Sequence, residues 1–172
     1  MPVMPRVRAT MSADQQQQHL TMIWLAMTLA LPIYIALKLM IVRPGPPGSP
    51  WLGRLCVLIG AAAYPAAWLV FQQGVGQLQA QATPTSLQRL SDDAKLALQM
   101  RAQSAVIMCL GLLETPVILG LVSALLRSPA FPAQMEWMAA LSLAGACLLK
   151  ARGLPAVHGL LKQLEIPMTG TR

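Results

Sequence analysis

The chain has 172 residues, of which 55% are hydrophobic and only 11% are charged, with a net charge of +7 and a mean hydropathy of +0.54. A soluble globular domain has about 25% charged residues, so this composition excludes an ordinary soluble domain and indicates a membrane protein long enough for four spans. The basic residues stand singly near the ends of apolar segments, not in runs interleaved with aromatic residues, which argues against nucleic-acid binding.

The N-terminal half is predicted to be a polar tail followed by two membrane spans. Residues 1–18 are polar and show no periodicity, so we expect a mobile tail. The first span is predicted over residues 20–42, and it is uncleaved because no small-residue cleavage site follows it. A proline-rich turn at residues 43–50 separates it from the second span, predicted over residues 51–72.

Small residues recur at helical spacing in the second span and again in the fourth. Gly60, Ala63 and Ala67 lie at positions i, i+3 and i+7 of the second span, which permits close approach by another helix. Ala140 and Ala144 give a similar small face to the fourth span. We expect both faces to pack against other membrane helices, in a homo-oligomer or a hetero-oligomer.

The C-terminal half repeats the pattern of two spans. Ser91, followed by two aspartates, is predicted to cap a third helix that begins near residue 92 and crosses the membrane over residues 101–127. The fourth span is predicted over residues 131–150. Residues 151–172 carry an amphipathic stripe, which favours a helix lying in the membrane interface, followed by a tail.

The predicted fold is therefore all-α: a polytopic membrane protein whose residues 19–150 form four transmembrane helices, with an amphipathic C-terminal helix. Residues 31–37 (LPIYIAL) and 115–121 (TPVILGL) align on their prolines, so the two hairpins are either a duplication or chance similarity between apolar segments. Lysine and arginine are more frequent on the side that holds both termini. This bias predicts cytoplasmic termini in a bacterial-type inner membrane.

Glu114 is the strongest candidate for a functional residue, because an ionisable residue within a membrane span is by default a functional-site hypothesis. Arg101 and Arg127 bracket it, and a helix with both arginines at the interfaces holds Glu114 about 20 Å from each, near the midplane. We expect a protonated, hydrogen-bonded carboxyl that either binds protons in function or bonds across a helix interface. Tyr64 lies at comparable depth and is its predicted partner.

Motifs for other chemistry do not occur in the sequence. It has no Gly-rich phosphate loop, nucleophile elbow or zinc-ligand spacing, so we expect neither an enzyme nor a cofactor nor a metal site. The three cysteines fall inside predicted spans and are read as packing residues.

Residues 58–127 resemble a known family. LIGAAAYPAAW, a polar connection ending in LALQMRAQS, and VIMCLGLLETPVILGLVSALL together are similar to the ring-forming proteolipid (c) subunit of rotary ATP synthases. The resemblance implies that Glu114 corresponds to the ion-carrying carboxylate. The sequence lacks that family's repeated Gly-x-Gly pattern and Arg-Gln-Pro loop, and it has two extra spans. We therefore predict a structural or accessory membrane subunit, with proteolipid-like proton translocation as the alternative.

Overall fold

The computed structural model describes residues 12–42, 48–81, 90–131 and 133–164. These residues are mostly helical and contain no strand, which confirms the predicted all-α class. In chain order the helices are α1 (Ala13–Ile41), α2 (Pro50–Phe71), the π-helix η1 (Gln72–Gly76), α3 (Gln77–Gln81), α5 (Asp92–Leu125), α6 (Gln134–Leu148), the π-helix η2 (Leu149–Gly153) and α7 (Leu154–Gln163).

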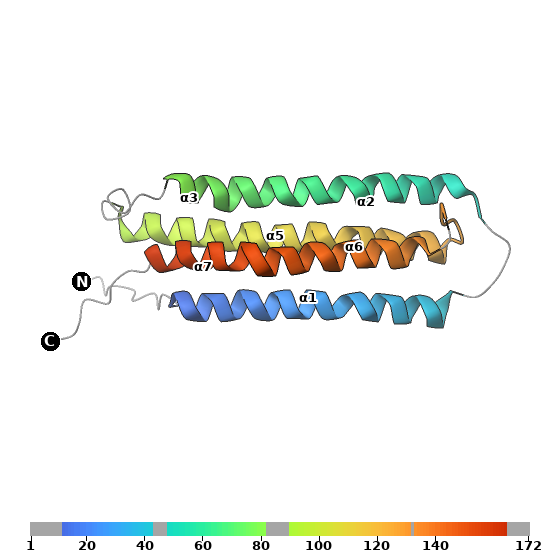
Figure 1. Cartoon of the computed structure of the whole chain (residues 1–172), viewed down its shortest axis with the longest axis horizontal. Helices are drawn as coiled ribbons and strands as arrows, with labels where there is room; N and C mark the ends of the chain where they lie inside the picture. Colours follow the sequence, from blue (N-terminus) through green and yellow to red (C-terminus); the bar gives the residue numbers. More distant parts are fainter. Residues whose placement is uncertain (1–11, 43–47, 82–89, 132, 165–172) are drawn as a thin grey trace, which may run out of the picture.

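The helices form four antiparallel rods (Figure 1). α2, η1 and α3 run end to end as one rod, α6, η2 and α7 form another, and α1 and α5 are the remaining two. α5 is central, because it packs against α1, α2 and α6. The start of α1 and the end of α7 lie at one end of the bundle, which we call the terminal end; the opposite end is the distal end (Figure 1).

Four helices among the described residues are long and apolar enough to cross a membrane, as predicted: Ala13–Ile41, Pro50–Gln79, Asp92–Leu125 and Gln134–Gln163. A rod of 30 residues is about 45 Å long, whereas the hydrocarbon core of a bilayer is about 30 Å thick. Each rod also extends beyond its predicted span, and for all four rods this extension lies mainly at the terminal end. At the terminal end the bundle therefore continues beyond the predicted spans, and its exposed surface there includes polar residues such as Asp14, Gln73 and Asp92.

The start of α1 illustrates this extension. Residues 13–18 were expected to belong to a mobile tail, but they are helical; residues 1–11 lie outside the described residues. Ser12 and Gln15 form a capping box, with Gln15 N donating to Ser12 Oγ at 3.3 Å and Ser12 N donating to Gln15 Oε1 at 3.1 Å. Gln16 is buried and its amide donates to Gln99 Oε1 on α5 at 3.5 Å. Capping and this contact order a segment without apolar periodicity.

The C-terminal amphipathic segment also differs from expectation. α7 continues the α6 rod through η2 and packs against α1 and α5, instead of standing apart as an interfacial helix. Its apolar stripe faces the bundle, where Leu160 and Leu164 join Leu78 and Ala102 in a core cluster of their own. The stripe is buried because the other rods extend equally far and offer it an apolar partner. Its buried members are Leu154, Val157, Leu160, Leu161 and Leu164.

The two π-helices lie where the second and fourth spans were predicted to end. A π-helix is a wider turn with i to i+5 hydrogen bonds, and glycines keep each one in contact with its neighbours. A Cβ at Gly74 would collide with Ala105 on α5, and a Cβ at Gly153 would lie 3.1 Å from Phe71 Cε2. Both rods therefore continue as packed helices beyond the predicted ends.

Candidate functional site

Glu114 is half-buried on α5 where α1, α5 and α6 meet. The hydroxyl of Tyr34, on α1, donates a hydrogen bond of 2.8 Å to Glu114 Oε1. The flanking residues Leu113 and Val117 are buried, and they fix the rotation of α5 that turns Glu114 toward α1. One carboxyl oxygen of Glu114 thus has a phenol as its partner.

Tyr64 was the predicted partner of Glu114, and the structure gives this role to Tyr34. The Tyr64 hydroxyl lies on α2 and points to α6, 3.4 Å from the carbonyl oxygen of Met138 and 3.5 Å from Ser142 Oγ. Both α1 and α2 contact α5, but of the two tyrosines it is Tyr34 that bonds the carboxyl. The sequence signal that could have found Tyr34 is that it is the only other tyrosine and also lies in an apolar span.

A small pocket lies next to the carboxyl. Glu114 and Ser142 are on its wall together with Thr28, while most of the lining is apolar. The apolar lining residues are Met27, Leu31, Leu110, Leu113 and Ala146. A glutamate, a serine and a threonine from three different helices therefore line one small, partly open pocket of the bundle.

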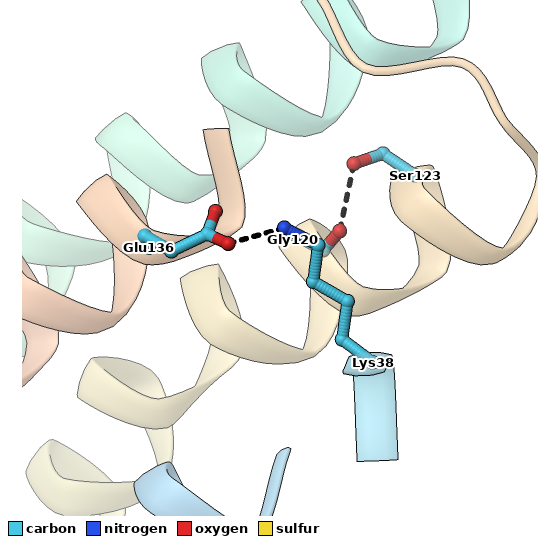
Figure 2. A network of polar contacts seen from close by, with 4 residues as sticks. All are labelled: Lys38, Gly120, Ser123 and Glu136. Carbon is cyan, nitrogen blue, oxygen red and sulfur yellow. Dashed lines mark hydrogen bonds and ion pairs between the residues drawn. The ribbon is translucent and has the colours of Figure 1, made fainter. Parts of the chain in front are cut away.

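An ion pair closes the distal end of the contact between α1 and α6. Lys38, in the last turn of α1, binds the carboxylate of Glu136, in the first turn of α6 (Figure 2). A cation near a helix C-terminus and an anion near a helix N-terminus are both favoured by the helix dipoles. The Ser123 hydroxyl donates to the Gly120 carbonyl at 2.8 Å, so this buried hydroxyl has a hydrogen-bond partner within α5.

Trp24 makes the corresponding contact on the other side of the pocket. Its indole Nε1 donates to the carbonyl oxygen of Ala146 at 2.8 Å, just before η2 begins. The Lys150 amine lies over the same ring, 4.1 Å from its centroid, which is a cation–π geometry. Polar contacts thus hold α1 to α6 and η2 on both sides of Glu114.

The two predicted small-residue faces differ in burial: the one on α2 is buried and the one on α6 is exposed. Gly60, Ala63 and Ala67 are buried, and a Cβ at Gly60 would lie 2.6 Å from Met138 Cε, so this face packs inside the chain. Ala140 and Ala144 are exposed on the single chain. Within the chain α6 instead packs through its neighbouring face, which includes Met135, Ala139, Ser142 and Ala146.

The remaining candidate groups are dispersed. No group of three His, Cys, Asp or Glu residues that could hold a metal occurs among the described residues. Cys56 and Cys109 are buried, Cys147 is exposed, and all three are free thiols.

Comparison with protein-family models, with curated proteins and with solved structures finds no match for this chain.

Proposed function

We propose that this chain is an integral membrane protein that serves as a small structural or accessory subunit. The observation that carries this proposal is the apolar outer surface of the bundle. Large apolar side chains are exposed along all four rods, among them Leu29, Ile33, Leu58, Ile118 and Leu141. A monomeric soluble protein rarely exposes apolar patches larger than a few hundred Å², so lipid and other membrane helices are the partners that suit this surface.

The proposed location is a bacterial-type inner membrane, with the terminal end of the bundle in the cytoplasm. The bias of lysine and arginine toward that end supports this orientation. Reporters fused after residue 172, or inserted near residue 82, are then expected to behave as cytoplasmic, and one inserted near residue 47 as exported. An exported C-terminal reporter would contradict the orientation.

Association with another helix is proposed to use the exposed face of Ala140 and Ala144, where small side chains allow close approach of two backbones. The test is the native mass of the particle in detergent or nanodiscs. The double variant Ala140→Leu and Ala144→Leu should lower the mass, whereas Ala61→Leu, at an exposed alanine of α2, should not. An unchanged mass in the double variant argues against this face.

Proton binding by Glu114 is the second candidate function. The observation that favours it is a carboxyl within an apolar bundle that has a phenol partner and a pocket beside it. The resemblance of residues 58–127 to proteolipid c subunits points to the same residue. A proton carrier must exchange its proton, whereas a structural carboxyl only needs to keep its hydrogen bond.

Purified protein in liposomes separates the two functions. Glu114→Gln keeps the shape and most of the hydrogen bonding but removes the titratable proton. The accessory role predicts that this variant changes neither assembly nor proton flux, and the proton-binding role predicts normal assembly with complete loss of proton flux. A hydrophobic carbodiimide, which reacts with protonated carboxyls, should modify Glu114 in preference to the exposed Asp92 and Asp93 if the acid is reactive.

A further inference from the structure

Two polar pairs meet at the pocket, and each of the four rods contributes one residue. Tyr34 of α1 binds Glu114 of α5, and Tyr64 of α2 contacts Ser142 of α6. Glu114 and Ser142 both line the pocket. The hydrogen bonds found among the described residues include none between these two side chains, so the pocket separates the pairs.

Ser142 has hydrogen-bonding capacity that is little used. Thr28, Thr115 and Ser123 each donate their hydroxyl hydrogen to a carbonyl of their own helix, at 2.8, 3.0 and 2.8 Å. Ser142 is only 1% exposed, and its hydroxyl lies 3.5 Å from the Tyr64 hydroxyl. Hydrogen bonds between hydroxyls are usually about 2.7 to 2.8 Å long, and a hydroxyl can donate once and accept twice. A buried hydroxyl on the pocket wall therefore has room for a stronger partner.

The pocket offers three polar groups to one small guest. Glu114 Oε1 accepts from Tyr34, and the hydrogen bonds among the described residues include none to the second carboxyl oxygen, which can accept from a guest. The Thr28 hydroxyl has given its hydrogen to Trp24 but can still accept. The pocket is partly open to the surface of the bundle, and its volume is about that of one water molecule. A buried water typically makes about three hydrogen bonds, which is the number of polar groups on the wall.

We propose that the pocket binds one water molecule, which bridges Glu114, Ser142 and Thr28. The water joins the Tyr34–Glu114 pair to Ser142 and so links α1, α5 and α6. This inference goes beyond the proposed function, because it holds whether Glu114 exchanges protons or is structural.

A double-mutant cycle on stability tests the bridge. Glu114→Leu and Ser142→Ala each remove one partner of the water, so each should raise the unfolding equilibrium constant. The double variant should raise it by at least about threefold less than the product of the single effects, because the second change removes a bridge that is already broken. The control pair is Glu114→Leu with Ser123→Ala. Their effects on the unfolding equilibrium constant should multiply, because the Ser123 hydroxyl bonds its own helix outside the pocket. Multiplicative effects for Glu114 and Ser142 would overturn the proposal.

Water-edited solid-state NMR on the unmodified protein keeps the proposal testable if a variant does not fold. Ala146 lines the pocket, and Val117 is fully buried outside it. Magnetisation from water should reach the Ala146 methyl group clearly earlier than the Val117 methyl groups. Equal build-up at the two residues would overturn the proposal whatever the mutant cycle shows. Neither readout uses proton flux, so a failure here is distinguishable from a failure of the proposed function.

Discussion

Replacing Leu161 with alanine tests whether α7 belongs to the core of the bundle. Leu161 is 0% exposed and lies in the main core cluster with Leu20 and Val157. Truncating a fully buried leucine to alanine costs about 2 to 5 kcal/mol, because transfer free energy is lost and a cavity remains. The next residue, Lys162, is exposed, so Lys162→Ala should change stability by no more than about 0.5 kcal/mol.

The assay is equilibrium unfolding in mixed micelles as the fraction of denaturing detergent rises, followed by the circular dichroism of the helices. Limited proteolysis of the C-terminal region accompanies it, because α7 can open without the rest of the bundle. We expect Leu161→Ala to unfold earlier or to be cut faster, and Lys162→Ala to behave as the unmodified protein. If the two variants are indistinguishable in both assays, α7 lies in the interface and the packed arrangement is refuted.

Two further predictions concern glycine and tyrosine. Gly74→Ala should destabilise the bundle by about 1 to 3 kcal/mol, because the added methyl group would overlap α5. Gly111→Ala should instead stabilise the bundle by up to about 1 kcal/mol, because that position faces open space. Thermal unfolding of the two variants checks that their effects on stability have opposite signs. Tyr34→Phe should change the rate at which a hydrophobic carbodiimide modifies Glu114, because it removes the hydrogen bond to that carboxyl, and Tyr64→Phe should change this rate less. Mass spectrometry of the modified peptide measures the rate in both variants. A larger effect of Tyr64→Phe would contradict the pairing of Tyr34 with Glu114.

Local chemistry was enough to predict the four long helices of the fold. Long apolar runs with singly placed charges predicted four helices able to cross a membrane, and the described residues contain four helices that are long and apolar enough. The third helix begins at Asp92 as expected, because Ser91 Oγ accepts from Ala94 N at 3.3 Å. Hydropathy and capping depend on residues that are near one another in the sequence, so they can be read without knowing the packing.

The partners of the helices could not be predicted in the same way. A helix that is apolar on all sides has no sequence-defined inner face, so the rotation of each rod follows from how distant segments fit together. This is why Tyr34, not Tyr64, meets Glu114, and why Ala140 lies outside. The amphipathic stripe around Leu160 was recognised, but hydropathy cannot distinguish a membrane interface from a neighbouring rod.

The π-helices also determine where the chain tolerates a change in length. Elsewhere in a rod, losing one residue turns everything beyond it by about 100° and carries buried side chains to the surface. A π-turn already holds one residue more than an α-turn needs. Deleting the exposed Ala151 within η2 therefore leaves an ordinary α-helix whose two flanks still face the bundle. By the same geometry, η1 and η2 are places in the described rods where the loss of a single residue can be accommodated over evolutionary time without loss of the fold.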